Sequence, residues 1–324
     1  MSIRWGVLGT AGIAAGCTVP GMLKAKDCEV YAIAGRDAGK VQEFQKRFGF
    51  KKMYIGYEEL LEDPEVQAVY IPLPNGIHYE WVMKAVKAGK NVLCEKPLAL
   101  SAAQAEEMYA AAAENGVILT EAFAYLHSPY VKALKEEIQS GSIGKVDYIE
   151  AAFVGQKCKP DNIRLVKELG GGAMYDLGCY CSSMILSLTD GETEYVKANA
   201  EIDDNGIDLC TSGIIKFDNG VRASFNVGMV FEEGSNGRFD RLYVHGTKGY
   251  IKSDVEFNQA GELTYTVMSG GKKQTRNVSA RQNYTLEVEH MNRMILEGAA
   301  PIVTPEFSIK NARLIDEVLQ AIGY

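Results

Sequence analysis

The chain has 324 residues, enough for about two domains, and its 47% hydrophobic and 23% charged content is ordinary for a globular protein. Its formal net charge of −8 provides no basic surface for a phosphate backbone, which argues against a nucleic-acid partner. No apolar run approaches the roughly 20 residues that a membrane helix needs, so we expect no membrane partner.

Cysteine and histidine usage argues against a structural metal. The seven cysteines include no Cys-x-x-Cys pair, and most lie in apolar runs, which suits reduced thiols. The four histidines are far apart and lack the spacing of metal ligands. The chain also enters its first predicted strand at Ile3 without the apolar region of a signal peptide. We therefore expect a cytoplasmic protein.

The first predicted elements resemble a dinucleotide-binding unit. Residues 3–8 are predicted to form a buried strand, and a helical stretch runs to about Lys26. Between them lies the loop Gly9, Thr10, Ala11, Gly12, Ile13 and Ala14. Gly9 permits a tight turn, and small residues let the backbone approach a pyrophosphate at the helix N-terminus. Ala11 and Ala14 replace two glycines of the G-x-G-x-x-G pattern, but the position directly after a strand favours a nucleotide site.

The end of the second predicted strand, 29–34, bears on the choice of cofactor. An NAD site usually has a carboxylate about 20 residues past the glycines, on the ribose 2′-hydroxyl. Here Gly35 and Arg36 occupy that place. A guanidinium suits a 2′-phosphate and Gly35 leaves room for it, so the sequence favours NADP(H), with NAD(H) as the alternative. Arg36 could instead be a solvated surface residue. Asp37 is predicted to be the N-cap of a helix reaching Phe48.

The alternation of strands and helices then continues. We expect strands at 66–71, 92–94 and 117–120, and helices at 77–88 and 101–115, with Gly89 ending the first of these helices. Strands separated by helices predict a doubly wound parallel sheet, as in a Rossmann domain.

Polar residues follow two of these strands. The apolar run 92–94 ends in Glu95 and Lys96, and Pro97 forbids the strand from continuing. Ligands bind at the carboxyl ends of strands in open α/β sheets. The candidate cofactor contacts at this edge are Pro74, Asn75, His78, Glu95 and Lys96. They could also be ordinary polar loop residues, but three polar residues (Asn75, His78 and Lys96) at one edge make that less favourable.

The second half of the chain has a different pattern. A helix at 129–139 precedes strands at 145–154, 193–201, 208–217, 220–228, 240–245 and 262–268, and two helices follow at 284–297 and 307–322. Turns such as Asp218-Asn219-Gly220 join consecutive strands, which predicts a largely antiparallel open sheet. We therefore expect an α/β domain at 1–121 and an α+β domain at 122–324.

One segment of the second domain stands apart. Three glycines, 170–172, open a predicted helix that reaches Leu188. Asp176 and Tyr180 are four residues apart and would share one face of that helix. A buried tyrosine hydrogen-bonded to a nearby aspartate would give the same pattern, so the residues alone leave both interpretations open.

Together these segments resemble the glucose-fructose oxidoreductase/inositol dehydrogenase/rhizopine-catabolism (Gfo/Idh/MocA) family over nearly the whole chain. The resemblance rests on the segments 9–14, Pro74-Asn75 with His78, Glu95-Lys96-Pro97, Glu121-Ala122-Phe123, 170–172 with Asp176 and Tyr180, and 245–249. Many members have a histidine where Tyr180 stands. Tyrosine there is similar to the branch of dimeric dihydrodiol dehydrogenases and NADP-dependent D-xylose dehydrogenases. That branch often has His-Pro where this chain has Ser128-Pro129, a departure that bears on the substrate pocket.

The resemblance implies an NADP(H)-dependent oxidoreductase of CH–OH groups on a sugar, polyol or diol. Tyr180 would be the acid/base. Because a phenol has an ordinary pKa of about 10, the positive charge of Lys96 would be needed to favour its ionised form at neutral pH. Asp176 would orient a neighbouring substrate hydroxyl. The resemblance also implies a homodimer or a higher homo-oligomer through the second-domain sheet, and a cis Lys96–Pro97 peptide.

Two other functions stay open. A non-catalytic NADP-binding sensor would need the nucleotide loop but neither Lys96 nor Tyr180. A reductase of a keto- or anhydro-sugar would use the same residues in the opposite direction. The sequence does not distinguish an aldose, a keto-sugar and a trans-dihydrodiol as substrate.

Overall fold

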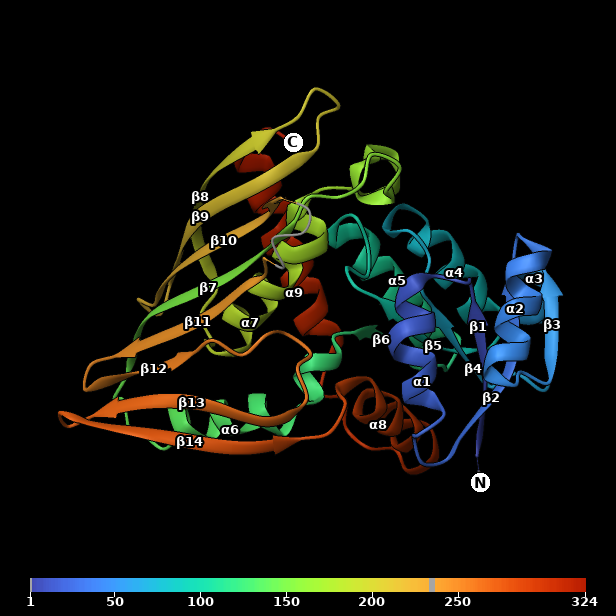
Figure 1. Cartoon of the computed structure of the whole chain (residues 1–324), viewed down its shortest axis with the longest axis horizontal. Helices are drawn as coiled ribbons and strands as arrows, with labels where there is room; N and C mark the ends of the chain where they lie inside the picture. The colour runs from blue at the N-terminus through green and yellow to red at the C-terminus, as the bar shows by residue number, and fades with distance from the viewer. Residues whose placement is uncertain (1, 233–236) are drawn as a thin grey trace. The chain divides into compact units, whose positions relative to one another are not determined.

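The computed structural model describes residues 2–232 and 237–324, which divide into two compact units (Figure 1). The first unit comprises Met1–Ala99, Ala103–Ser128 and Arg281–Ile309, and the second comprises Leu100–Ala102, Pro129–Ala280 and Lys310–Tyr324. The units thus differ from the sequence-based domains 1–121 and 122–324 mainly in residues 281–309. These join the first unit because helix α8 (Asn283–Glu297) packs into its core, where Trp5 Nε1 donates to Asn292 Oδ1 at 2.9 Å.

The first unit contains a parallel sheet, as predicted, and this sheet has six strands. The strand order is β3-β2-β1-β4-β5-β6, so the order reverses beside β1. The strands are β1 Ile3–Leu8, β2 Cys28–Gly35, β3 Lys52–Ile55, β4 Ala68–Ile71, β5 Asn91–Glu95 and β6 Leu119–Ala122. The sequence did not predict β3, because its four residues sit at the sheet edge and lack a fully buried run. The reversal makes the carboxyl ends of β1 and β4 the expected ligand edge.

The helices of this unit are α1 Val19–Met22, α2 Ala38–Phe48, α3 Glu58–Glu62, α4 His78–Lys87, α5 Ala102–Glu114 and α8. The first differs from the helix predicted to reach Lys26. It begins as a wide π-helical turn, Ala14–Thr18, and ends after the four residues of α1. Asp27 then has a φ of +53°, which turns the chain directly into β2.

Several local predictions in the first unit are confirmed. The Asp37 side chain accepts a hydrogen bond from the Lys40 backbone N–H at 3.1 Å and so caps α2. Gly89, just after α4, has a φ of +71°, which favours glycine. The Lys96–Pro97 peptide bond is cis.

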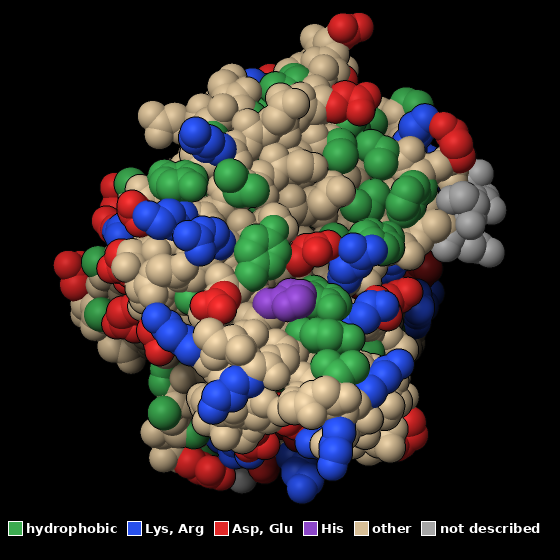
Figure 2. Space-filling model, turned by 90° about the vertical axis from the view of Figure 1, so that its left-hand side faces the viewer, with side chains coloured by type: hydrophobic (Ala, Val, Ile, Leu, Met, Phe, Trp, Pro, Cys, Tyr) green, Lys and Arg blue, Asp and Glu red, His purple; other side chains and the backbone are tan. Residues whose placement is uncertain are grey.

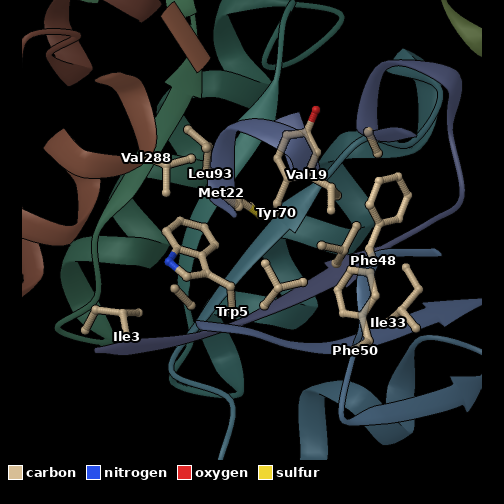
Figure 3. Close-up of a cluster of buried hydrophobic side chains, with 14 of the residues drawn as sticks. Ile3, Trp5, Val19, Met22, Ile33, Phe48, Phe50, Tyr70, Leu93 and Val288 are labelled. Atoms are coloured by element: carbon tan, nitrogen blue, oxygen red, sulfur yellow. The ribbon is translucent and has the colours of Figure 1, made fainter. Parts of the chain in front are cut away.

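The core of the first unit lies between the sheet and helices α1, α2 and α8 (Figure 3). Trp5 and Tyr70 are the largest of its fully buried side chains. Tyr70 places a hydroxyl in this apolar surrounding, where an unpaired polar group would be costly.

The Tyr70 hydroxyl is paired on both sides. Thr18 Oγ1 donates to it at 2.9 Å, and it donates to Glu95 Oε1. Burial, followed by the charge of Glu95, raises the pKa of Tyr70 well above its ordinary value, so the phenol stays neutral and keeps its donor. This chain of hydrogen bonds joins the turn after the glycine loop to the strand end that precedes Lys96.

The second unit contains an eight-stranded, mostly antiparallel sheet in the order β14-β13-β12-β11-β7-β10-β9-β8. Among the described residues, β7 and β10 form its parallel pair. The strands are β7 Val146–Gln156, β8 Thr193–Ile202, β9 Asp208–Phe217, β10 Arg222–Phe231, β11 Phe239–Gly246, β12 Gly249–Ser253, β13 Gly261–Ser269 and β14 Lys272–Ala280. The prediction of a largely antiparallel open sheet is confirmed. The sequence missed β12, which has only five residues, and β14, which is mostly polar.

Helices cover one face of this sheet (Figure 1). Helix α6 (Pro129–Gln139) packs on β14, and α7 (Cys179–Ser187) packs on β7 and β10. Helix α9 (Pro305–Ala321) begins in the first unit and ends in the second. Along β7, Ile149 and Ala151 are buried on the covered face, whereas Tyr148 and Glu150 lie on the other face. No helix of the described residues is long and apolar enough to cross a membrane.

We predict that Tyr70→Phe lowers the free energy of unfolding by about 2 kcal/mol. The substitution keeps the ring but removes the hydroxyl that satisfies Thr18 and Glu95 in a buried site. Chemical denaturation of the purified variants measures this loss. The control is Tyr79→Phe, which removes the hydroxyl bonded to Glu107 on the surface and should cost less than about 0.5 kcal/mol. Equal effects of the two substitutions would contradict the prediction.

Candidate functional site

The glycine loop lies at the carboxyl end of β1. Gly9 has a φ of +124°, and its N–H donates to the Ala34 carbonyl at 2.8 Å. A Cβ on Gly9 would lie 3.1 Å from the Leu73 side chain, whereas one on Gly12 would meet nothing within 4 Å. The loop is thus closely packed against Leu73 at Gly9 and has open space beside Gly12. Thr10, Ala11, Gly12 and Ile13 are all at least partly exposed, which fits the backbone approach that a pyrophosphate needs.

Arg36 follows the carboxyl end of β2 and is exposed. Gly35 is required there, because a Cβ would lie 2.7 Å from the Val41 side chain. The backbone N–H of Gly56 donates to the Gly35 carbonyl at 2.9 Å and brings Tyr57 beside the guanidinium. Burial raises the pKa of Tyr57, and the charge of Arg36 opposes this rise. Sequence analysis missed Tyr57, since no spacing rule connects it to Arg36.

Pro74 and Asn75 follow β4, and His78 begins α4. Pro74 and Asn75 are partly exposed, but His78 is fully buried. Its Nδ1 lies 2.9 Å from the Pro97 carbonyl and its Nε2 lies 2.8 Å from the Leu73 carbonyl. Burial lowers the pKa of His78, so the ring is neutral and donates to one of these carbonyls. His78 therefore lies beneath the loops that follow β4 and β5 and connects them.

The segment after β5 is also held from below. Glu95 is buried and accepts the Tyr70 hydrogen bond, whereas the next residue, Lys96, is half-buried. Glu121, at the end of β6, accepts a hydrogen bond from the Leu98 backbone N–H at 2.9 Å. Burial raises the pKa of Glu121 to about 7, although the charge of Lys96 counteracts this. The segment around the Lys96–Pro97 peptide is thus held by two buried carboxyl groups, those of Glu95 and Glu121.

In the second unit, a wide π-helical turn, Met174–Gly178, carries Asp176 and leads into α7, which carries Tyr180. The start of this turn is fixed by Asp208, which accepts hydrogen bonds from the Met174 N–H and the Thr211 hydroxyl, both at 2.8 Å. Burial raises the pKa of Asp208 to about 6. Gly172 has a φ of +116°, and its Cβ would collide with Asp208 Oδ1 at 2.1 Å. The glycine-rich segment is therefore required by this buried carboxylate.

Asp176 is paired with a residue that sequence analysis missed. Arg164 Nε lies 2.6 Å from Asp176 Oδ2, and the Arg164 side chain is more exposed than that of Asp176. The charge of Asp176 raises the pKa of Arg164 and outweighs burial, and Tyr180 adds a smaller contribution. Asp176 and Tyr180 are therefore both close to Arg164. No pattern in the sequence identifies Arg164, because the loop at 157–173 has no regular period.

Tyr180 is partly exposed and lies among aromatic rings. Its ring centroid lies 5.6 Å from that of Phe153 and 5.1 Å from that of Phe257. The Asn258 amide donates to the Tyr180 hydroxyl at 3.3 Å. The ring is thus packed in place while its hydroxyl keeps polar neighbours.

The candidate residues therefore fall into two groups. The first unit brings together Gly9, Thr10, Ala11, Gly12, Ile13, Arg36, Pro74, Asn75, Glu95 and Lys96 at the carboxyl edge of one parallel sheet, with His78 beneath them. The second unit brings together Asp176 and Tyr180 around Arg164. Over residues 2–232 and 237–324, no group of three His, Cys, Asp or Glu could hold a metal ion.

Comparisons with known proteins agree with this geometry. Residues 3–123 match a family described as "Oxidoreductase family, NAD-binding Rossmann fold", and residues 131–252 match the "GFO/IDH/MocA C-terminal domain". The chain is 32% identical over 324 residues to D-xylose 1-dehydrogenase (NADP(+)) 2 of Haloferax volcanii, covering 98% of this chain and 97% of the relative. It is 31% identical over 335 residues to trans-1,2-dihydrobenzene-1,2-diol dehydrogenase of Xenopus tropicalis, covering 100% and 99%.

A solved structure is also similar over nearly its whole length. The 3-ketoreductase KijD10 of Actinomadura kijaniata, in complex with NADP and TDP-benzene, matches with a TM-score of 0.93 at 29% identity, covering 99% of this chain and 98% of that one. The sequence motifs, the parallel sheet with its glycine loop and the two matched domain families lead to one conclusion. The chain belongs to the Gfo/Idh/MocA oxidoreductase family and has its NAD-binding Rossmann fold.

Proposed function

We propose that this protein transfers a hydride between NADP(H) and a hydroxyl or carbonyl carbon of a sugar or related diol, with Tyr180 as the acid/base. As a family member it is an NAD(P)-dependent dehydrogenase or reductase acting on CH–OH groups. The observation that carries the proposal is the setting of Tyr180. Its phenol is partly exposed, accepts an amide hydrogen bond and interacts with the nearby Arg164 cation.

The cofactor supplies the hydride chemistry at its nicotinamide when bound. The residues of the first unit fit such a group. The open loop Gly9–Ile13 would receive the pyrophosphate, and Arg36 beside Tyr57 would receive the 2′-phosphate. Pro74, Asn75, Glu95 and Lys96 would border the nicotinamide end, with His78 supporting them from below.

Each polar residue has a proposed role in moving the substrate proton. Tyr180 accepts the hydroxyl proton during oxidation and returns it during reduction. Lys96 contributes a positive charge that favours the phenolate and donates a hydrogen bond to the substrate oxygen. Asp176, oriented by Arg164, accepts a hydrogen bond from a neighbouring substrate hydroxyl. This set suits a substrate with at least two adjacent oxygens.

The names of the relatives describe both reaction directions. D-xylose 1-dehydrogenase is named for oxidation of an aldose, and the 3-ketoreductase is named for reduction of a ketone. A keto- or anhydro-sugar reductase is therefore the second candidate. A non-catalytic NADP-binding sensor is less favoured, because a sensor has no use for a phenol with cationic neighbours.

We predict that Tyr180→Phe and Lys96→Ala each lower kcat by about 10²-fold or more, the range of general acid–base catalysis, while the affinity for NADPH is retained. The assay is reduction of NADP⁺ and NAD⁺ against a panel of aldoses and cyclic diols, with reduction of keto-sugars as its reverse arm. Lys87→Ala, on the exposed surface of α4, is the control for Lys96. Near-wild-type turnover in either variant would remove that residue from the mechanism.

We predict that Arg36→Ala weakens binding of NADPH at least tenfold and binding of NADH much less. The guanidinium would lose a charge-assisted contact to a phosphate that only NADPH carries. Fluorescence titration of the two reduced cofactors measures both affinities. Lys51→Ala is the control, since this exposed cation pairs with Glu29 on the surface. Equal weakening of both cofactors would overturn the assignment of Arg36 to the 2′-phosphate.

We also propose that the protein forms a homodimer through the uncovered face of the eight-stranded sheet. Figure 2 shows hydrophobic, basic and acidic side chains mixed on this side of the molecule, with a histidine among them. On β11 and β12, Tyr243 and Tyr250 stack with their centroids 5.0 Å apart, and His245 lies 4.5 Å from Tyr243. Arg241 pairs with Glu150 beside them at 2.9 Å. Aromatic and arginine side chains on a broad sheet face are typical of interfaces, and a two-fold axis would pair each patch with itself.

We predict that the wild-type protein sediments as a dimer and that Tyr243→Glu shifts it toward the monomer. The added carboxylate would be desolvated at the centre of the interface. Analytical ultracentrifugation measures the change. Met53→Glu adds the same charge to an exposed hydrophobic side chain of the first unit and should leave the dimer intact. A wild-type monomer would contradict the proposed interface.

A further inference from the structure

Asn258 has an unusual backbone conformation close to Tyr180. It lies in the loop between β12 and β13, and its φ of +65° is one of two positive values among the described non-glycine residues. Asparagine tolerates this left-handed region better than most side chains. Residues held in sparsely populated backbone regions often cluster at functional sites, and Asn258 lies beside the proposed acid/base.

The residue before Asn258 is fixed by an ion pair between the partly exposed side chain of Arg238 and the buried carboxylate of Asp240. Arg238 donates two hydrogen bonds to the Asp240 carboxylate, at 2.8 and 2.7 Å. Asp240 Oδ2 accepts the Phe257 backbone N–H at 2.7 Å, and Arg238 donates to the Phe257 carbonyl at 3.1 Å. Both backbone groups of Phe257 are therefore held by side chains of β11 and its preceding residue. The loop is fixed directly before Asn258.

This fixed loop brings two side chains against Tyr180. The Phe257 ring packs on the Tyr180 ring with 5.1 Å between centroids. The next residue turns back through its positive φ, and Asn258 Nδ2 donates to the Tyr180 hydroxyl at 3.3 Å. Asn258 Oδ1 is buried and has no hydrogen-bond partner among the described residues. The amide thus makes its hydrogen bond through the donor end, toward the phenol.

We propose that Asn258 is a positioning residue that favours the ionised form of Tyr180 by donating a hydrogen bond to its phenolic oxygen. This proposal rests on the proposed role of Tyr180 as the acid/base. A phenolate is an acceptor only, and a hydrogen bond to an ionised acceptor is roughly twice as strong as one to a neutral acceptor. The amide contributes most when the phenol has lost its proton.

The charged groups around Tyr180 form ion pairs with one another, so the hydrogen bond from Asn258 is a separate contribution to the stability of the phenolate. Arg164 and Arg238 both interact electrostatically with the phenol. Each cation is already paired with a carboxylate, Arg164 with Asp176 and Arg238 with Asp240, and Glu256 lies 3.4 Å from Arg238. Cys158 lies near Arg164 and Asp176, and burial raises the pKa of its thiol, so it stays neutral. Because Arg164 and Arg238 are each held by a carboxylate, a donor bonded directly to the phenolic oxygen adds to their effect on the phenol.

Two substitutions separate the amide from the backbone conformation. Asn258→Gly removes the amide and adopts a positive φ without strain. Asn258→Asp keeps the size of the side chain and replaces the donor with an anionic oxygen. The matched control is Asn277→Asp, which adds the same charge at an exposed position on β14.

The kinetic test is the pH profile of kcat/KM for oxidation of the best aldose or diol of the panel. We expect Asn258→Gly to lower kcat/KM at neutral pH roughly tenfold, the loss expected for one hydrogen bond to a charged group. We expect Asn258→Asp to lower it further. In both variants the rising limb of the profile moves to higher pH, most in Asn258→Asp, while the KM for NADP⁺ stays the same. A merely structural role would lower the rate at every pH without moving this limb.

A second readout does not require turnover. The near-ultraviolet absorbance of tyrosinate is titrated in wild-type protein and in Tyr180→Phe, so that the difference isolates one phenol among 17 tyrosines. The same difference is then measured in the Asn258→Gly and Asn258→Asp backgrounds. We expect the midpoint to rise from wild type to Asn258→Gly to Asn258→Asp. Identical midpoints, or a pH limb that does not move, would overturn the inference.

The outcomes distinguish the two proposals. If Tyr180→Phe keeps its turnover, the proposed function of Tyr180 fails. If Tyr180→Phe loses turnover but both Asn258 variants titrate like wild type, only the role of Asn258 fails. The two Asn258 variants change the loop in different ways, since one removes the side chain and the other adds a charge. If one variant fails to fold, the other still tests the role of Asn258.

Discussion

A single buried hydroxyl, that of Tyr70, connects the turn after the glycine loop to the end of β5 in the cofactor-binding unit. Tyr70 on β4 accepts a hydrogen bond from Thr18 and donates one to Glu95. These two residues belong to the turn after the glycine loop and to the end of β5. In an apolar core such a pairing is strongly directional, because any shift of either segment would leave a buried polar group unsatisfied. The positions of the loop and of Lys96 are therefore linked through the core of the sheet.

In the second unit, buried carboxylates hold the backbone in place through hydrogen bonds. Asp208 is fully buried and holds the first turn of the helix that presents Asp176 and Tyr180. Asp240, also buried, holds the loop that carries Asn258. In both cases the carboxylate binds backbone N–H groups, so it fixes the path of the main chain and not only one side chain. Functional side chains on such supported segments lose little entropy when they meet a ligand.

These supports are consistent with the proton chemistry proposed for two partly exposed side chains. Tyr180 and Lys96 are both partly exposed, whereas the residues that fix their segments are buried. A phenol that must gain and lose a proton needs neighbours whose positions and charges do not change with it. The paired cations near Tyr180 meet this need, because each is held by its own carboxylate. The same reasoning makes a neutral amide such as Asn258 a useful donor.

The sequence by itself determined the fold class, the family and the main candidate residues. Alternating strands and helices, glycines at required turns and the Glu95-Lys96-Pro97 segment are local patterns, and local patterns can be recognised in one chain. Only the tertiary structure decided that α8 joins the first unit and that buried His78 connects the loops after β4 and β5. It also decided that Tyr70, Arg164 and Asn258 form hydrogen bonds with predicted residues. Each of these facts depends on a hydrogen bond or ion pair between residues with no fixed spacing in the sequence. Such pairs form because burial leaves a polar group one acceptable partner, and which residue becomes that partner is settled only when the chain is packed.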